Sequence, residues 1–432
     1  MRLALAATGH TPRRARPAPF EEAPGVFVLL ITSTFTLMSA AVLSPVVELL
    51  RIDQGLTGTA AGLVVTVHAA TFAAVSPFAG RAVDRWGARR PLATGLLLFG
   101  VVGAAGLVVE AYPLLIVTRL ISGVGLAFVY TGTMVALLDR YDDARRDRAM
   151  GRLAFALGLG GVVWPLIGGG LGVLSWHASF AVFLVGVPLA MLAWRLPERP
   201  HRPSPARRSR SVTRNPALLG VYLLHCVTSA LFNMVLVFLP MRLADIGVTS
   251  PIAAALFTAA PSVTMSAAGL AYLRLRARLG YGGLLRLAFG AWAVALLALA
   301  VGDIPVIPLG AVAVVGGGMG ILVPSLAILA CDLVQPTQRG QATSLLATAG
   351  CVGQLAAPLV FGPLEQVSAG FLVGAGLAAV ASWPLSRLVA PRRRDEAAYI
   401  RGEADPKPVA DTSVTGVTSG QQTGRELARL EE

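Results

Sequence analysis

The sequence predicts an all-α polytopic membrane protein with twelve transmembrane helices, in two six-helix bundles related by a pseudo-two-fold axis. Two observations support this prediction. Of the 432 residues, 55% are hydrophobic and only 14% are charged, whereas a soluble domain carries about 25% charged residues. The charges also cluster between long apolar stretches, which have no polar face to offer to water. An ordinary soluble enzyme is therefore excluded.

Charge and cysteine usage exclude further classes of protein. The formal net charge of +13 does not indicate nucleic-acid binding, because the basic residues separate apolar stretches instead of forming one solvated face. Cys226, Cys331 and Cys351 lie inside apolar stretches without CxxC spacing, so neither a disulfide framework nor a zinc site is predicted. We expect no metal, no cofactor and no nucleic acid to bind.

The first six spans follow from the charge-free stretches, because a spanning helix needs about 20 mostly apolar residues. These stretches are residues 23–47, 54–80, 91–109, 120–138 and 153–194. The last has 42 residues and an interfacial break at Ser175, Trp176 and His177, so it must form two helices. The fourth span extends back to about Tyr112 and therefore carries Arg119 inside the membrane.

The second set of six spans is read in the same way. Its charge-free stretches are residues 215–241, 246–273, 287–302, 304–331, 340–364 and 366–386. The stretch 287–302 has only 16 residues and is completed by Leu284 and Leu285. The total is twelve spans.

The predicted domain boundaries follow from these spans. The N-terminal bundle covers residues 25–194 and the C-terminal bundle residues 216–390. Between them, residues 195–215 hold seven Arg and several Pro without an apolar period, which predicts a cytoplasmic linker. Residues 1–24 form a cytoplasmic segment without the apolar stretch of a cleavable signal peptide, and residues 391–432 form a disordered cytoplasmic tail.

The two bundles also repeat each other. A shift of 191 to 195 residues places Arg148 on Arg339 and Pro165 on Pro358. Because each bundle has an even number of helices, both have the same orientation, as in a parallel repeat about an axis along the membrane normal.

The distribution of Lys and Arg predicts the topology. Thirty-three of the 36 basic residues lie in the segments that share a side with the N-terminus, Arg51 and Arg242 lie on the other side, and Arg119 is intramembrane. Basic residues favour the cytoplasmic side. We therefore expect a multi-pass plasma-membrane protein with both termini in the cytoplasm.

The loop after the second span carries a dense motif, which reads Gly80-Arg-Ala-Val-Asp84-Arg85-Trp86-Gly87-Ala-Arg89-Arg90. Glycines at both ends allow a tight turn, and Asp84 can cap a helix N-terminus. This motif resembles the loop signature, motif A, of the major facilitator superfamily, with Ala88 in place of the usual basic residue. The resemblance implies a gating role for Asp84, with Asp139 as its network partner through Arg85 or Arg89.

Two further motifs resemble the same family. The fourth span contains Arg119-Leu-Ile-Ser-Gly123, similar to motif B. The fifth resembles motif C of antiporters, with Trp164 in place of a Gly. Its helix-bending residues are Gly160, Pro165, Gly168 and Gly169. Glycines allow close helix approach, and a proline removes one backbone hydrogen bond, which predicts a bendable seam.

Several polar residues inside the spans are candidates for coupling or for lining a cavity. Arg119 either faces a cavity or a partner, because a buried charge is costly, or it snorkels to the outer surface. The coupling candidates are Arg119, His68, His225 and Glu48, although a buried neutral His is also common. The cavity-lining candidates, which could equally join helices, are Thr32, Thr36, Asn233 and Gln354.

The resemblance implies a secondary active transporter that works by alternating access. The resemblance of the fifth span to motif C favours an antiporter that exports a small organic molecule or drug in exchange for protons. We expect the protein to act as a monomer in the lipid bilayer. A facilitated or symport-type uptake carrier of a small solute is the alternative, because no carboxylate lies near mid-membrane. An integral membrane enzyme is disfavoured, because the five His are dispersed. A non-transporting receptor with this fold is the remaining alternative.

Overall fold

The structure is a computed structural model that describes residues 23–138, 143–196, 215–335, 338–364 and 366–382. The chain divides into a unit of residues 1–390 and a second unit of residues 391–432. The second unit lies outside the described residues, as do nearly all of the N-terminal segment, most of the linker 195–215 and Asp139.

Twelve helical segments form the N-terminal half. They are α1 (Ala23–Ser33), α2 (Phe35–Ala41), η1 (Ser44–Val46), α3 (Val47–Asp53), α4 (Gly58–Thr66), α5 (His68–Trp86), α6 (Arg89–Gly103), η2 (Ala104–Leu107), α7 (Tyr112–Leu138), α8 (Asp143–Gly172), η3 (His177–Val185) and α9 (Gly186–Trp194). Together they build six spans, because α1 to α3, α4 with α5, α6 with η2, and η3 with α9 are consecutive pieces of single spans.

Five helices form the part of the C-terminal half that the structure describes. They are α10 (Pro216–Asp245), α11 (Pro251–Val301), α12 (Val306–Asp332), α13 (Arg339–Phe361) and α14 (Val367–Val380). The start of α10 is fixed locally, since the Asn215 side chain accepts a hydrogen bond from the Ala217 amide at 3.0 Å and Pro216 occupies the first turn.

The count of twelve spans holds for the described residues. Ten helical segments are long and apolar enough to cross a membrane. One of them, α11, has 51 residues and contains non-helical backbone at Gly280, so it supplies two spans, and the shorter α14 supplies the last. Two details differ from the sequence prediction. The basic segment 274–286 is helical on both sides of this kink, and the first and second spans are broken at Thr34 and Val67.

The glycines with positive φ reveal the internal repeat. Gly55 (φ 60°) ends the first span and Gly247 (φ 84°) ends the seventh, 192 residues later. Gly87 (φ 74°) and Gly280 (φ 63°) stand between the second and third spans of each half, 193 residues apart. A residue other than glycine rarely adopts this conformation. Both separations fall within the predicted shift.

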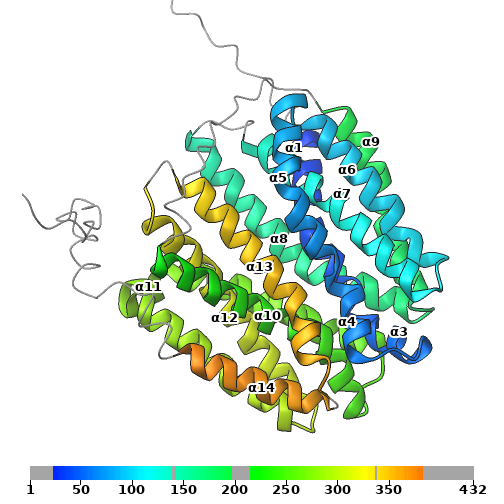
Figure 1. Cartoon of the computed structure of the whole chain (residues 1–432), viewed down its shortest axis with the longest axis vertical. Helices are drawn as coiled ribbons and strands as arrows, with labels where there is room; N and C mark the ends of the chain where they lie inside the picture. The colour runs from blue at the N-terminus through cyan, green and yellow to red at the C-terminus, as the bar shows by residue number, and fades with distance from the viewer. Residues whose placement is uncertain (1–22, 139–142, 197–214, 336–337, 365, 383–432) are drawn as a thin grey trace, which may run out of the picture. The chain divides into compact units, whose positions relative to one another are not determined.

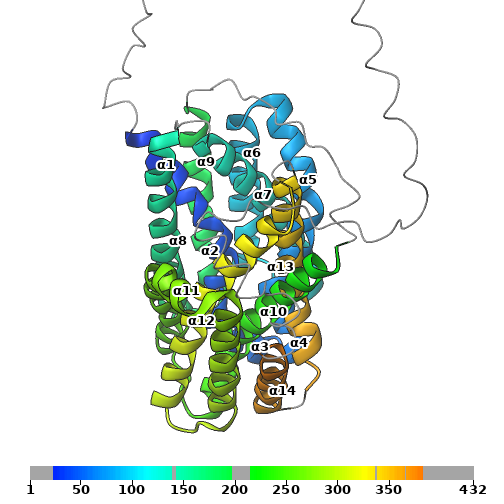
Figure 2. The same cartoon turned by 90° about the vertical axis from the view of Figure 1, so that its left-hand side faces the viewer.

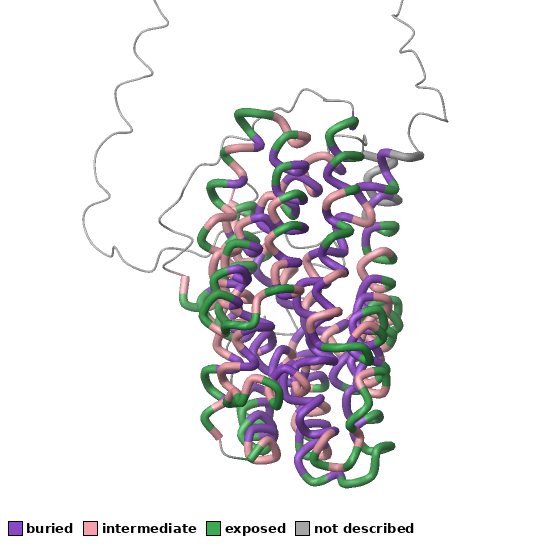
Figure 3. Tube along the Cα trace, turned by 90° about the vertical axis from the view of Figure 1, so that its right-hand side faces the viewer, coloured by how far each residue is buried: buried purple, intermediate pink, exposed green. Residues whose placement is uncertain are grey.

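The two halves are distinct sets of helices within the first unit (Figures 1 and 2). The helices α1, α5, α6, α7 and α9 lie together, and α10, α11, α12 and α14 lie together. Exposed residues, coloured green, alternate with buried ones along many of the helices (Figure 3). Exposed apolar side chains such as Leu270 (88%) and Phe155 (74%) are expected where a helix faces lipid.

The halves meet along two seams. In one seam α8 lies against α11, and in the other α13 lies against α4 and α5. We call the end of the helices that carries Arg51, Arg242 and Asp303 the Arg51 end, and the opposite end the Asp84 end. Near the Arg51 end, the Ser44 hydroxyl donates a hydrogen bond across the halves to the Leu236 carbonyl.

Candidate functional site

Arg119 lies inside the N-terminal half and is fully buried. Its Nε donates to the Val64 carbonyl at 3.2 Å, and its NH2 group donates to the carbonyl and hydroxyl oxygens of Ser39 at 2.8 and 2.7 Å. Its guanidinium carbon lies 4.8 Å from the centre of the Phe183 ring. The side chain therefore does not snorkel. Its partners are backbone carbonyls, a hydroxyl and an aromatic face.

The bonds of Arg119 join three spans near their irregular points. Ser39 lies in α2, between the break at Thr34 and the 3₁₀ turn of η1, and Val64 lies three residues before the break at Val67. Broken helices in a membrane leave backbone groups that need other partners. Arg119 on α7 supplies donors to both broken spans.

The polar run of the first span is also held within the N-terminal half. Thr32 is fully buried, and its hydroxyl lies 3.0 Å from that of Thr133 on α7. Thr36 donates to the Ser33 carbonyl at 3.0 Å. At the break itself, the Trp164 indole donates to the Thr34 hydroxyl at 3.0 Å. The tryptophan that departs from motif C thus supports the break in the first span.

The glycines of α8 allow three helices to approach closely. An added Cβ at Gly160 would lie 2.8 Å from Thr34 Cβ, and one at Gly168 would collide with the Val42 carbonyl. At Gly169 it would lie 2.5 Å from Ala255 Cβ of α11, in the other half. The helix continues through Pro165 to Gly172. These glycines therefore serve close contact within one half and across the two halves.

The Asp84 motif differs from one expectation. Gly80 is not at a turn, because α5 continues to Trp86, and the turn is made by Gly87 with its positive φ. Asp84 lies in the last turns of α5, and the residue before α6 is Ala88, without a side-chain cap. The motif lengthens the helix before the turn.

The remaining arginines of this motif lie around the same turn. Arg85 is exposed in the last turn of α5, and Arg89 and Arg90 begin α6. The predicted partner Asp139 lies outside the described residues.

Side chains from both halves come within electrostatic range of each other between α7 and α13. Tyr130 of α7 packs edge-on against Phe72 of α5, with ring centres 5.7 Å apart. The Tyr130 phenol lies within electrostatic range of the Cys351 thiol on α13. Gln354 lies one turn further along α13 and is half-buried. We call Phe72, Tyr130, Cys351 and Gln354 the interhalf cluster.

His225 belongs to the C-terminal side of this region. It is half-buried on α10 and its ring packs closely against Gly350 of α13. A Cβ added to Gly350 would lie 3.0 Å from the His225 Nε2. Its Nδ1 is buried without a hydrogen-bond partner among the described residues. His68 is almost fully buried, and its Nδ1 has no partner either. Asn233 bonds within its own helix, to the Ser229 carbonyl at 2.9 Å.

Two ion pairs between described residues lie at the Arg51 end. Glu48 accepts two hydrogen bonds from Arg51, both of 2.7 Å. Arg242 donates to Asp303 at 2.9 Å and to the carbonyls of Leu299, Ala300 and Gly302. Since those carbonyls end a helix, the cation is well placed. Glu48 is thus already paired in this structure.

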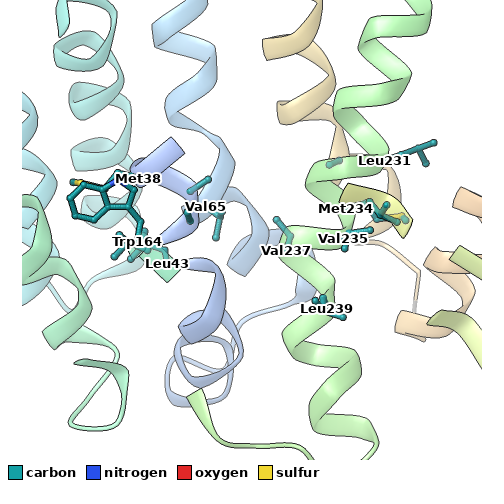
Figure 4. Close-up of a cluster of buried hydrophobic side chains, with 14 of the residues drawn as sticks. Met38, Leu43, Val65, Trp164, Leu231, Met234, Val235, Val237 and Leu239 are labelled. Atoms are coloured by element: carbon teal, nitrogen blue, oxygen red, sulfur yellow. The ribbon is translucent and has the colours of Figure 1, made fainter. Parts of the chain in front are cut away.

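Hydrophobic side chains of the two halves also face each other near the Arg51 end. Figure 4 shows Val65 of α4 and Val237 of α10 on the facing sides of the two halves, with Met38 and Trp164 deeper in the N-terminal half. An added Cβ at Gly62 would lie 2.9 Å from Val237 Cγ1. The described residues contain no cluster of three or more His, Cys, Asp or Glu that could hold a metal ion.

The sequence matches the model of a known protein family. The model described as Major Facilitator Superfamily matches residues 29–358 and 221–417. The chain belongs to the Major Facilitator Superfamily. Membership agrees with the twelve spans, with the repeat of two six-helix halves, and with the Asp84 motif between the second and third spans.

Two bacterial members of the superfamily have similar sequences. Multidrug resistance protein 1 of Bacillus subtilis is 31% identical over 176 residues, which cover 40% of this chain and 45% of that protein. Quinolone resistance protein NorA of Staphylococcus aureus is 26% identical over 155 residues, which cover 36% of this chain and 40% of that protein. The chain thus spans less than half the length of the curated relatives it matches.

Solved structures share the fold over most of the chain. A crystal structure of the nucleoside transporter NupG superimposes with a TM-score of 0.73 at 14% identity, covering 84% of this chain and 99% of that one. The inward open xylose transporter XylE from E. coli gives 0.68 at 14% identity, covering 85% and 97%. At this identity, the likeness establishes the superfamily fold alone.

Sequence reasoning missed several residues that the structure brings together. Trp164 was noted only as a departure from motif C, and Phe183 had no signal at all. Tyr130 had no signal in the sequence, and Cys351 entered only as a cysteine without disulfide or zinc spacing, because nothing in their spacing indicates that they approach each other across the halves. Asp245 was missed at the Arg51 end, although it follows Arg242 by one helical turn.

Proposed function

We propose that this chain is a secondary active transporter that exports a small organic molecule in exchange for protons by alternating access. One observation carries the proposal: two repeated halves of a superfamily member touch through small residues between the middle of the helices and the Arg51 end. Rocking of the halves about the interhalf cluster would then change access.

Export is supported by the names of the relatives, two bacterial resistance proteins, and by the glycine seam of α8. The formal charges in the middle of the spans favour the alternative of a facilitated or symport-type uptake carrier. In the middle of the described spans the only formal charge is that of Arg119, and no carboxylate is available there to bind a proton. Coupling is therefore the feature that an experiment has to decide.

His225 is the coupling residue that we favour. It lies on α10 against α13, half-buried, with an unpartnered Nδ1. His68 is buried within the N-terminal half and Glu48 is paired with Arg51. Both are therefore less accessible to a proton that the transporter moves from one side of the membrane to the other. Imidazole is the side chain whose ordinary pKa lies closest to neutral pH, so a histidine that water reaches in one state of the cycle could bind and release the coupled proton.

The interhalf cluster supports a substrate class. It offers two aromatic rings, a phenol, a thiol and an amide, without a formal charge. Aromatic faces and a few polar groups suit neutral or weakly basic aromatic molecules. The substrate would contact Tyr130 from one half and Cys351 from the other.

We further propose that the Arg51 end faces the outside and that both termini face the cytoplasm, as the basic residues favour. The protein would act as a monomer in the plasma membrane, and the Asp84 motif would control the cytoplasmic gate. Reporter fusions after Arg90 and Arg394 should then read cytoplasmic, and fusions after Asp53 and Asp303 should read external. An external reading after Arg90 would contradict this orientation.

The experiment that tests the function is flux in proteoliposomes with an imposed pH gradient, against a panel of neutral, cationic and zwitterionic aromatic compounds. We expect substrate movement that depends on the gradient in the wild type. His225→Gln should lose this dependence while keeping downhill exchange, and His68→Gln should keep both. Flux that ignores the gradient in the wild type would favour the facilitated carrier, and absence of any flux would contradict transport.

A further inference from the structure

A pocket of about 410 Å³ lies at the Arg51 end, separate from the interhalf cluster. Its floor consists of buried apolar side chains, which are Met234, Phe238, Met241, Phe361 and Phe371. Its rim carries Arg51, Asp245, Gln366 and Ser368. A volume of this size holds a small organic molecule, and rings with thioethers favour an aromatic one.

The rim has an unbalanced negative charge. Arg51 already donates two hydrogen bonds to Glu48, and Arg242 is held by Asp303 and three carbonyls. Among the described residues, no hydrogen bond or salt bridge engages the Asp245 carboxylate, although both arginines lie within electrostatic range. A ligand that complements the rim is therefore positively charged.

The pocket exists only where the two halves meet. Arg51 and Gly58 come from the N-terminal half, and the remaining lining residues come from α10, from the end of α13 and from α14 with the turn before it. An added Cβ at Gly58 would lie 3.3 Å from Phe238 Cε1 and 3.7 Å from the Gly362 carbonyl. Separation of the halves at this end would remove one wall. A ligand here would thus bind the closed form better than the open form.

We propose that this Arg51-end pocket binds an aromatic monocation, with the rings on the methionine and phenylalanine floor and the charge beside Asp245. Occupancy holds the two halves together at this end. Such a ligand opposes the opening step and inhibits the protein from that side. The site is distinct from the interhalf cluster, and its existence does not require that the chain transports anything.

The test measures binding of tetraphenylphosphonium to the full chain in lipid nanodiscs by equilibrium dialysis. Asp245→Asn removes the charge, and Gly370→Leu fills the pocket from a position where an added Cβ has its nearest neighbour at 3.8 Å. Glu110→Gln makes the same change of charge on an exposed loop, and Gly376→Leu makes the same change of size on the open face of α14. Asp245→Glu keeps the carboxylate.

We expect the Asn and Leu changes in the pocket to weaken binding about tenfold or more, and the other three variants to stay within about threefold of the wild type. Tetraphenylphosphonium should also slow amide hydrogen exchange in residues 56–62 and 358–364 of the wild type, but not of Asp245→Asn. Equal affinity in all variants, no binding by the wild type, or loss of binding in Asp245→Glu would each overturn the proposal. Because no step measures flux, a failure of the transport proposal would leave this result unaffected.

Discussion

Three consecutive glycines of α8 face three different surroundings, and substitution of each by alanine separates packing within a half from packing between halves. At Gly168 the added Cβ collides with the Val42 carbonyl of the same half. At Gly169 it lies 2.5 Å from Ala255 Cβ and 2.6 Å from the Pro251 carbonyl, both in the other half. At Gly170 it meets no atom within 4 Å.

The magnitudes follow from these distances. Overpacking of a tight contact costs about 1 to 3 kcal/mol, while glycine to alanine in a helix gains up to about 1 kcal/mol. Gly168→Ala should therefore lower the free energy of unfolding by about 1 to 2 kcal/mol, and Gly170→Ala should leave it unchanged or raise it slightly. Gly169→Ala pushes the halves apart, so its cost falls on the closed form and favours opening at the Arg51 end.

The assay is thermal unfolding of the full chain in detergent, combined with a spin-label distance between Ile52 and Thr249, exposed residues of the two halves at the Arg51 end. Gly168→Ala should melt earlier with an unchanged distance. Gly169→Ala should lengthen the distance with little change in melting temperature. Equal behaviour of the Gly168, Gly169 and Gly170 variants would refute the assignment of these glycines to separate contacts.

Three further predictions concern single side chains. Arg119→Ala leaves the Ser39 and Val64 carbonyls without their donor, so it should reduce the stability of the protein by about 2 kcal/mol or more and also reduce flux. Arg119→Lys should be no worse than Arg119→Ala. Wild-type flux in the Ala variant would remove the coupling role. Asp84→Asn should reach the membrane but lose most of its flux, as measured in proteoliposomes, and full flux would reduce this carboxylate to a surface charge. His225→Lys, which fixes a positive charge, should abolish the response of flux to a pH gradient, and an unaltered response would exclude this histidine as the proton carrier.

Much of the fold was predictable because the membrane core accepts only helices whose backbone groups are satisfied internally. Charge-free stretches therefore mark the spans, and the shift of about 192 residues marks the repeat that Gly55 and Gly247 display. The turn between the second and third spans was found by its motif, but its details were not. The turn lies at Gly87 and not at Gly80, because α5 continues through Gly80 to Trp86.

The rest depends on contacts between distant segments. Neither Thr34 nor Val67 is a glycine or a proline. At the first break the Ser33 and Thr34 hydroxyls bond back to the Leu30 and Ile31 carbonyls, a local feature that bends helices. Tertiary bonds accompany both breaks, since Trp164 bonds to Thr34, and Arg119 bonds beside both breaks. A charge in a span predicts a partner. The sequence cannot reveal that the partners are carbonyls and a phenylalanine ring.

Reciprocal motion at the two ends of the helices is the most direct test of alternating access. In a variant with all three native cysteines replaced by serine, one pair of spin labels would report the Arg51 end, at Ile52 and Thr249, and a second pair the Asp84 end, at Arg81 and Arg274. A change of pH or addition of a transported compound should lengthen the first distance while it shortens the second. Distances that both stay constant, or both change in the same direction, in a protein that still carries out flux would contradict the account.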